Sequence, residues 1–227
     1  MKTTSSMFAM LQTAHSVLTG AGSVNQIGNE VSRFGKKVLI VCDRGIAEAG
    51  LVERIKRILE DSKIQSGVFD KVEPEPRIEL VHQCAEAVRS KNYEVLVGLG
   101  GGSSLDVAKG AAIVIANGGK IEDYLGIGLV PKRGIPTILV PTTSGTGSEA
   151  TKYAIFTTGN MKQGVIDPNL YASVAIVDPE LTLSMPPRIT AATGMDALCH
   201  AIEAYVSLEA SPFTDIFAIE AIISGQF

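Results

Sequence analysis

Strand-length apolar runs alternate with amphipathic segments as far as Pro141. Runs that are apolar at almost every position occupy residues 37–42, 94–98 and 137–140, and a shorter strand ends at residues 68–69. Apolar residues recur at helical spacing in residues 52–62, 78–88 and 104–116. Strands that are apolar on both faces and are separated by helices predict an α/β fold, in which a parallel sheet is covered by helices on both faces.

The pattern changes after Pro141. Residues 153–156 and 164–166 predict a hairpin around a turn at 157–160, and residues 175–177 predict one more strand. Beyond Pro186-Pro187, residues 189–206 and 213–223 are helical in pattern, and Ser211-Pro212 is a typical start for the second helix. We therefore assign residues 1–186 to the α/β domain and residues 187–227 to the first helices of an all-helical domain, which we expect to be incomplete.

Composition narrows the possible functions of the chain. It has 227 residues, of which 45% are hydrophobic, and a formal net charge of −4. Charges of both signs are scattered, so no basic stripe predicts nucleic-acid binding, and no apolar run approaches the roughly 20 residues of a membrane span. Three widely spaced cysteines (Cys42, Cys84, Cys199) are typical of reduced thiols. We expect a cytoplasmic protein that acts on a small molecule.

A run of glycines follows the third predicted strand. This glycine loop, residues 98–103, includes Gly100, Gly101, Gly102 and Ser103 and leads into the helix at 104–116. Glycines let the backbone approach a pyrophosphate closely, and the amides and dipole of a helix start stabilise its charge. The alternative is a tight turn with a capping box, because Ser103 and Asp106 have the spacing of one.

A second loop, residues 141–151, follows the fourth predicted strand and contains Thr142, Thr143 and Thr146. Its hydroxyls and amides would close over a ligand from the other side, although such composition is also ordinary for loops. Both loops lie at the carboxyl ends of parallel strands, where open α/β sheets bind ligands.

Asp43 ends the first predicted strand. A carboxylate in this position would accept hydrogen bonds from an adenosine ribose and repel a 2′-phosphate, which favours NAD over NADP. The alternative is a cap for the following turn. In an ordinary Rossmann domain the acidic residue follows the glycine loop by about 20 residues, whereas here it precedes the loop.

Asp196 and His200 are spaced i, i+4 in a predicted helix. This spacing places a carboxylate and an imidazole on one helix face, where both would reach one divalent cation. The alternative is a surface pair that stabilises the helix by about 0.2–0.5 kcal/mol. Two protein ligands rarely hold a catalytic metal, and we interpret His15 and His82 as structural or surface residues.

Three motifs in this order resemble those of the iron-containing (group III) alcohol dehydrogenase family. They are the segment from Gly100 to Ser103 with Asp106 and Lys109, the second loop from Pro141 to Glu149, and the helix from Gly194 to Tyr205. The resemblance spans nearly the whole chain. One departure from the family pattern is Glu75, which lies between Pro74 and Pro76, where members of the family commonly have asparagine.

The resemblance implies a dinucleotide-binding α/β domain followed by a helical, metal-binding catalytic domain. It implies that NAD is bound by Asp43, Gly100, Gly101, Gly102, Ser103, Asp106, Thr142, Thr143, Thr146, Lys162 and Leu183. It also implies a metal held by one aspartate and three histidines, of which Asp196 and His200 match the first two and are the expected catalytic residues. The metal would be Fe²⁺, with Zn²⁺ also compatible with such ligands.

The resemblance thus implies a metal-dependent alcohol dehydrogenase that moves hydride between NAD and a small primary alcohol, diol or aldehyde, in a homo-oligomer. Two alternatives stay open. One is a dehydroquinate-synthase-like lyase, which also uses NAD and a metal but fits the second loop and the Asp196 helix less well. The other is a nucleotide-binding module without catalytic activity, because the metal site lacks further ligands.

Overall fold

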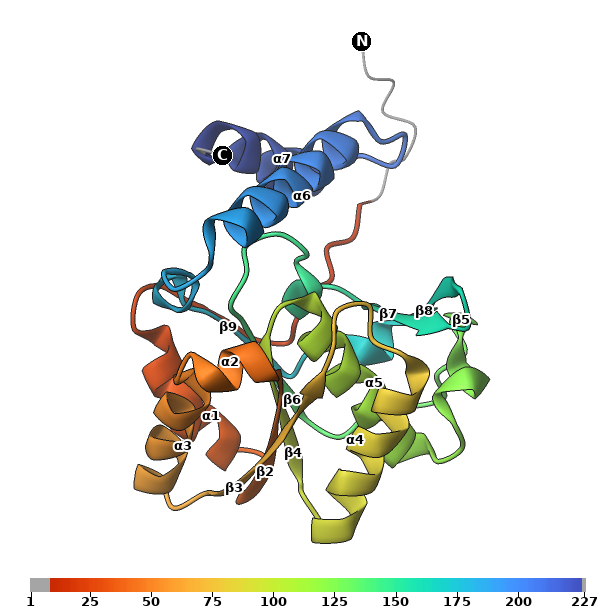
Figure 1. Cartoon of the computed structure of the whole chain (residues 1–227). Helices are drawn as coiled ribbons and strands as arrows, with labels where there is room; N and C mark the ends of the chain where they lie inside the picture. The colour runs from red at the N-terminus through yellow and green to blue at the C-terminus, as the bar shows by residue number, and fades with distance from the viewer. Residues whose placement is uncertain (1–8, 226–227) are drawn as a thin grey trace. The chain divides into compact units, whose positions relative to one another are not determined.

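Six parallel strands form the main sheet, in the order β1-β9-β6-β4-β2-β3 (Figure 1). The computed structural model describes residues 9–225. The strands of this sheet are β1 (Val17–Thr19), β2 (Lys37–Asp43), β3 (Gln65–Val72), β4 (Val95–Gly100), β6 (Thr137–Pro141) and β9 (Val174–Val177). The parallel α/β sheet expected from the apolar runs is therefore confirmed.

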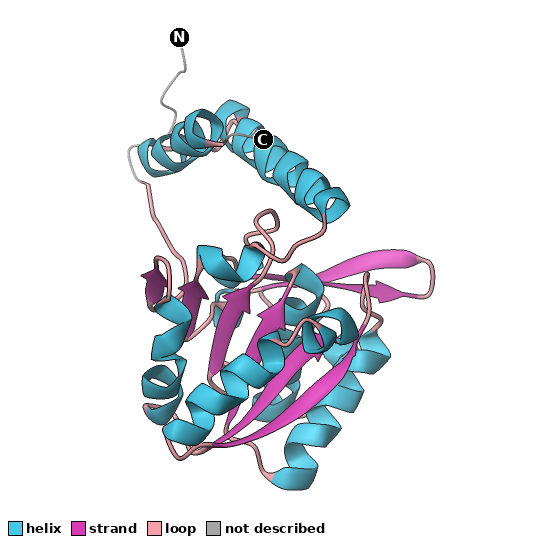
Figure 2. Cartoon of the chain, turned by 60° about the vertical axis from the view of Figure 1, so that its left-hand side comes forward, coloured by secondary structure: helices cyan, strands magenta, loops and turns pink. Residues whose placement is uncertain are grey.

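Helices cover both faces of this sheet (Figures 1 and 2). The elements on one face are η1 (Ser23–Gln26), α1 (Ile27–Ser32), α2 (Arg44–Glu48) and α3 (Leu51–Asp61), and those on the other are α4 (Ile78–Lys91) and α5 (Gly102–Asn117). Successive strand residues face opposite sides, so Val95 and Val97 join the α1–α3 core while Leu96 joins the α4–α5 core. The apolar residues of the inner strands β2, β4 and β6 are thus buried on one of these two sides, whereas Val17 of β1 and Val68 of β3, on the edge strands, are exposed.

A smaller sheet extends from the α5 side, in the order β5-β8-β7. Its strands are β5 (Gly126–Ile127), β7 (Tyr153–Thr158) and β8 (Met161–Ile166), and β7 and β8 form the expected antiparallel hairpin. Phe156 of β7 packs so closely on α5 that a Cβ at Gly110 would lie 2.7 Å from its ring. The remaining short helices are η2 (Ile121–Tyr124), η3 (Ser148–Ala150), η4 (Pro168–Leu170) and η5 (Pro179–Thr182).

The described chain divides into two compact units. One contains residues 13–143 and 147–184, and thus both sheets. The other contains the described part of residues 1–12, the loop residues 144–146, and residues 185 onward, with helices α6 (Pro187–Val206) and α7 (Pro212–Ser224). This division falls beside the boundary proposed at residue 186. No helix within the described residues is long and apolar enough to cross a membrane.

The structure corrects the sequence interpretation at several short elements. Strand β3 begins at Gln65 and is longer than expected, because as an edge strand it alternates exposed and buried residues and so lacks a continuous apolar run. Strand β1 and helices α1 and α2 were not anticipated, because three to six residues are too few for a clear periodicity. Helix α5 starts at Gly102 rather than at residue 104.

Asp178, which directly follows β9, connects β9 to the segment that follows the edge strand β1. Its carboxylate is 1% exposed and accepts hydrogen bonds from the amides of Gly22, Val24 and Glu180, at 3.2, 3.1 and 3.0 Å. These bonds join the segment after β1 to the segment after β9. The bond from Val24 is buried and the other two are partly buried, so the carboxylate satisfies donors that folding removes wholly or partly from solvent.

We predict that Asp178→Ala lowers the free energy of unfolding by about 2–4 kcal/mol, since it leaves buried amides without an acceptor. Urea denaturation followed by circular dichroism measures the effect. The matched control is Glu180→Ala, which removes only a half-exposed ion pair with Arg54 and should cost less than about 1 kcal/mol. Equal losses in the two variants would contradict the assigned role of Asp178.

Candidate functional site

The carboxyl ends of three adjacent strands, β2, β4 and β6, bring the first group of predicted site residues together. Asp43 ends β2, Gly100 ends β4, and Thr142 directly follows β6. The amide of Thr142 donates a hydrogen bond to the carbonyl of Gly100 at 3.0 Å. The two loops singled out in the sequence therefore start side by side at one edge of the main sheet.

Gly100 occupies a position that requires glycine. Its φ is +140°, and a Cβ there would lie 2.8 Å from Oγ and 3.1 Å from Cβ of Ser104. An L-residue would be strained by the backbone and would also displace Ser104. The glycine therefore permits the sharp turn from β4 into α5.

The first turn of α5 carries free amide donors. Its N-cap is Gly101, which provides no side-chain hydrogen bond, and none of the described residues accepts a hydrogen bond from the amides of Gly102 and Ser103. The capping-box alternative is wrong, because Ser103 already lies inside the helix and Asp106 binds elsewhere. Unsatisfied amides at the start of a 16-residue helix are typical of anion-binding sites.

Asp43 divides its two oxygens between two roles. Oδ1 accepts a hydrogen bond from the amide of Ile46 at 3.0 Å and caps α2, so the capping alternative is confirmed. Oδ2 has no hydrogen-bond partner among the described residues, and it lies 3.4 Å from the position that a Cβ of Gly100 would take. One carboxylate oxygen therefore stays available beside the glycine loop, in the place expected for a ribose acceptor.

The neighbouring thiol of Cys42 does not contribute reactive sulfur. Burial, together with the charges of Asp43 and Asp70, raises its pKa to about 12. The thiol is therefore protonated at neutral pH, and Cys42 serves as an apolar core residue.

The second loop begins next to the glycine loop. Thr142 is buried, and Thr143 is half-buried with its hydroxyl and methyl groups 3.5 Å from the position that a Cβ of Gly101 would take. No other heavy atom lies within 4 Å of that position. The space between Gly101 and Thr143 is thus a cradle that any side chain at position 101 would partly fill, which fits a closely approaching phosphate.

Asp106 lies one turn further along α5 and binds the second loop rather than the cradle. It accepts hydrogen bonds from the Ser148 hydroxyl at 2.6 Å and from the amide of Ile155 at 3.0 Å. Lys109 lies 3.4 Å from the same carboxylate and is almost fully buried. Direct contact of Asp106 with a cofactor stays a prediction, and its observed partners are protein groups.

Lys162 and Leu183, the last two residues of the predicted cofactor site, are both exposed. Lys162 is an exposed residue of β8 whose ammonium is 2.8 Å from Oε1 of Glu75, the residue that departs from the family pattern. Glu75 has a φ of +53°, a conformation that asparagine adopts more readily than glutamate. Leu183 follows η5 and is 83% exposed. No hydrogen bond or ion pair within the described residues joins either one to the glycine loop.

Asp196 and His200 lie together on helix α6 in the other unit. Nε2 of His200 is 3.7 Å from Oδ1 of Asp196. Two atoms that bind one ion at about 2.0–2.2 Å each must lie no more than roughly 4.4 Å apart, so this pair can share an ion. Among the described residues, no group of three or more histidine, cysteine or acidic side chains forms a metal site.

The tip of the second loop, Ser144–Thr146, belongs to the same unit as this pair. Gly145 approaches α6 so closely that a Cβ would lie 2.8 Å from the carbonyl oxygen of Thr193. The Gly145 carbonyl is 3.3 Å from Nδ1 of His200. A carbonyl only accepts, so Nδ1 is the donor in this bond, and in the neutral ring with that proton Nε2, the nitrogen that faces Asp196, carries the lone pair.

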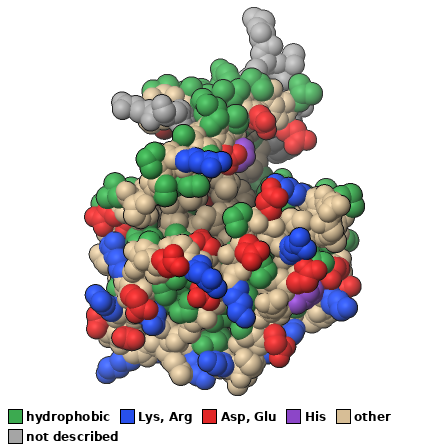
Figure 3. All heavy atoms as spheres, viewed as in Figure 1, with side chains coloured by type: hydrophobic (Ala, Val, Ile, Leu, Met, Phe, Trp, Pro, Cys, Tyr) green, Lys and Arg blue, Asp and Glu red, His purple; other side chains and the backbone are tan. Residues whose placement is uncertain are grey.

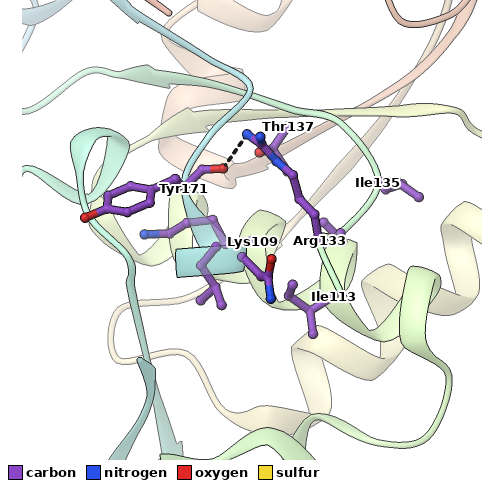
Figure 4. Close-up of a pocket in the computed structure, with 10 residues that line it drawn as sticks. Lys109, Ile113, Arg133, Ile135, Thr137 and Tyr171 are labelled. Carbon is purple, nitrogen blue, oxygen red and sulfur yellow. Dashed lines mark hydrogen bonds between the residues drawn. The ribbon is translucent and has the colours of Figure 1, made fainter. Parts of the chain in front are cut away.

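A hollow between α5 and the start of β6 is too small to be the nucleotide site. Its cavity volume is about 10 Å³, and it is lined in part by Lys109, Arg133 and Tyr171, with the Arg133 guanidinium donating a hydrogen bond to the Tyr171 carbonyl (Figure 4). Drug-sized ligands occupy roughly 300–1,000 Å³. The hollow is therefore too small for a dinucleotide.

Sequence reasoning missed two contributors to these sites. Ser148 links the second loop to Asp106, and Gly145 supplies the carbonyl beside His200. Both were read only as part of a Ser/Thr/Gly-rich loop. For Ser148, the usable signal in the sequence is Lys109, a lysine within a largely apolar helix and one turn after Asp106, because such a charge needs polar partners from a neighbouring segment. For Gly145, no sequence pattern indicates that its backbone carbonyl is a partner of His200.

The chain is similar to known proteins along most of its length. Residues 14–179 match the family model described as "Iron-containing alcohol dehydrogenase", and residues 190–224 match "Fe-containing alcohol dehydrogenase family, C-terminal". The NAD-dependent methanol dehydrogenase of Bacillus methanolicus is 43% identical over 206 residues, which cover 89% of this chain and 54% of that protein.

Two solved structures are similar along nearly the whole chain. A 1,3-propanediol oxidoreductase is 33% identical with a TM-score of 0.91, and the match covers 94% of this chain and 56% of that one. Sulfoacetaldehyde reductase from Bifidobacterium kashiwanohense, solved in complex with NAD⁺, is 35% identical with a TM-score of 0.85, and the match covers 94% and 58%. The chain thus spans about half the length of the relatives it matches.

We predict that Gly101→Ala weakens ADP binding about tenfold while the free energy of unfolding changes by less than about 0.5 kcal/mol. The added methyl group meets only Thr143 at an ordinary contact distance, so the fold is kept, but it occupies the cradle. Titration calorimetry with ADP and urea denaturation measure the two quantities. Unchanged ADP affinity would place the phosphate elsewhere.

Proposed function

The chain belongs to the iron-containing alcohol dehydrogenase family, and on that premise we propose that it provides the NAD-binding part and the first metal ligands of an alcohol dehydrogenase. The reaction is hydride transfer between NAD and a small primary alcohol, diol or aldehyde. One observation carries the proposal: the free oxygen of Asp43 lies beside Gly100, and the free amides of Gly102 and Ser103 directly follow the same turn.

In this proposal the amides at the start of α5 bind the pyrophosphate of NAD. Gly100 and Gly101 let the backbone approach it, and Thr142 and Thr143 border it from β6. Oδ2 of Asp43 accepts from the adenosine ribose and repels a 2′-phosphate, so NAD is preferred over NADP. The relative that was solved with NAD⁺ supports the choice of cofactor.

Asp196 and His200 would hold the divalent metal, Fe²⁺ or Zn²⁺. When bound, the metal would polarise the substrate oxygen and NAD would carry the hydride. Asp196 supplies a negative oxygen, and His200 presents Nε2 because its Nδ1 proton is directed at Gly145. Both side chains are about half exposed, at 43% and 55%, so an ion can reach them from solvent.

A second candidate function is a nucleotide-binding module without catalysis. It is favoured by the absence, among the described residues, of any third ligand near Asp196 and His200. A cation with two protein ligands is held weakly, and turnover would then need ligands from outside the described residues.

We also propose that the protein associates with itself and resides in the cytoplasm. Helices α6 and α7 expose large apolar side chains, which gather over this unit in Figure 3: Ile189, Met195, Ile202, Tyr205, Val206, Phe213, Ile216, Phe217, Ile219 and Ile223. Contiguous apolar surface of this kind is typically covered by another chain. Cys42, Cys84 and Cys199 are free thiols, which is typical of reducing compartments.

We predict that the 227-residue chain binds NAD in titration calorimetry with a dissociation constant of about 1 μM or higher. This corresponds to a binding free energy no more favourable than about −8 kcal/mol. Titrations with Fe²⁺ under anaerobic conditions and with Zn²⁺ separate the two candidate functions. Weak metal binding supports the module for the chain alone. Tight stoichiometric metal binding, with NADH formed from C2 to C4 alcohols or diols, supports the enzyme, and failure to bind NAD would contradict both.

We predict that Asp43→Ser lowers the preference for NAD over NADP at least about tenfold. Serine retains the cap of α2, because its hydroxyl also accepts from a helix amide, but it removes the negative charge that repels a 2′-phosphate. The two dissociation constants are compared with those of the unaltered chain. Asp43→Asn, which keeps the size and the cap, is the matched control and should shift the preference in the same direction. An unchanged ratio in both variants would remove Asp43 from the ribose site.

A further inference from the structure

Lys109 is a charged side chain inside the α/β unit, and it binds protein groups only. It is 1% exposed, and its ammonium donates hydrogen bonds to the carbonyls of Ser148, at 2.9 Å, and of Tyr153. Oδ1 of Asp106 lies 3.4 Å away. Burial lowers the pKa of Lys109, while the charge of Asp106 acts in the opposite direction. The ammonium thus has three oxygen partners, two of them on the segment from η3 to β7.

Asp106 binds the same segment from one turn earlier in α5. Its two oxygens accept from the Ser148 hydroxyl at 2.6 Å and from the Ile155 amide at 3.0 Å. Ser148 is therefore held twice, by its hydroxyl through Asp106 and by its carbonyl through Lys109. The helix whose first turn offers free amides to the phosphate thus also holds the end of the second loop.

The beginning of the second loop is held as well. The amide of Thr142 donates to the carbonyl of Gly100, and Thr143 borders the cradle at Gly101. With both ends of the loop bonded to the β4–α5 segment, the spacing between Thr143 and the helix amides is set before a ligand arrives. Ordering that is complete before binding does not have to be paid for by the ligand.

The ion pair between Asp106 and Lys109 is not explained by stability alone. Replacing one by apolar residues of similar volume is often neutral or stabilising, because desolvation of the charges offsets their attraction. Here the pair offers directed bonds to one hydroxyl, one amide and two carbonyls of the neighbouring segment. Apolar residues would fill the space but would not fix the position of Ser148.

We propose that Asp106 and Lys109 are positioning residues for the dinucleotide, which act through Ser148 to hold the second loop against the phosphate-binding turn of α5. This inference rests on the proposed NAD site. It assigns Asp106 a role without direct contact to the cofactor, in place of the contact that the family resemblance implies. The affinity for NAD then depends on side chains that do not touch it.

The test compares NAD dissociation constants by titration calorimetry with free energies of unfolding by urea denaturation, for three variants of the 227-residue chain. Ser148→Ala removes the hydroxyl that Asp106 holds and leaves the buried ammonium paired. Asp106→Asn keeps the size of the side chain but removes its charge. Asp167→Asn is the matched control: this buried carboxylate also accepts two backbone amides, from Val130 and Asn169, but it follows β8 and caps η4, and within the described residues it has no hydrogen bond to Ser148 or to α5.

We expect Ser148→Ala and Asp106→Asn to weaken NAD binding roughly threefold to tenfold at temperatures where both are folded. Asp167→Asn should be destabilised but should keep the NAD affinity of the unaltered chain. If Asp106→Asn does not fold, Ser148→Ala alone decides. Unchanged NAD affinity in folded Ser148→Ala, or an equal loss in Asp167→Asn, would overturn the positioning role. Failure of the unaltered chain to bind NAD would instead overturn the proposed function.

Discussion

Strand β4 is buried along its entire length, with β2 and β6 hydrogen-bonded to its two edges and helices packed on its two faces. Parallel pairing requires all three strands to run in one direction, so their carboxyl ends reach the same edge of the sheet. Asp43, the glycine loop and Thr142 are brought together for this reason, although they are far apart in the sequence. The burial of apolar side chains therefore places the polar groups of the proposed nucleotide site.

The same burial explains why this site is made largely from backbone. Leu105, Val107 and Ala108 of α5 pack into the core, so the helix axis lies close to the sheet and the turn from β4 has little room for side chains. Ser104 already occupies the space next to Gly100. Glycines are the residues that fit, and the amide groups they leave accessible are the donors that an anion requires. Packing density and phosphate recognition thus favour the same residues.

Most of the fold followed from the sequence because its strands are short continuous apolar runs and its longer helices have clear periodicity. The site was predictable where chemistry depends on local sequence, as at the glycine loop and at Asp43. The prediction was wrong where a side chain could either cap its own helix or bind a segment distant in the sequence. Ser103 and Asp106 have the spacing of a capping box, but Gly101 becomes the cap, and Asp106 turns instead to Ser148 and Ile155. Such a choice depends on residues about 40 positions away, which periodicity cannot reveal.

The pair on α6 illustrates the same distinction. Helical spacing alone places Asp196 and His200 on one face, and Nε2 and Oδ1 are 3.7 Å apart. Spacing says nothing about which ring nitrogen carries the proton. The carbonyl of Gly145, 55 residues earlier, lies 3.3 Å from Nδ1 and accepts from that nitrogen when it carries a proton; it can approach because glycine has no Cβ to meet the Thr193 carbonyl. A residue with a side chain at position 145 would move the carbonyl away, and the imidazole would then be free to present either nitrogen. The orientation of the imidazole beside Asp196 therefore depends on the loop glycine as well as on the helix.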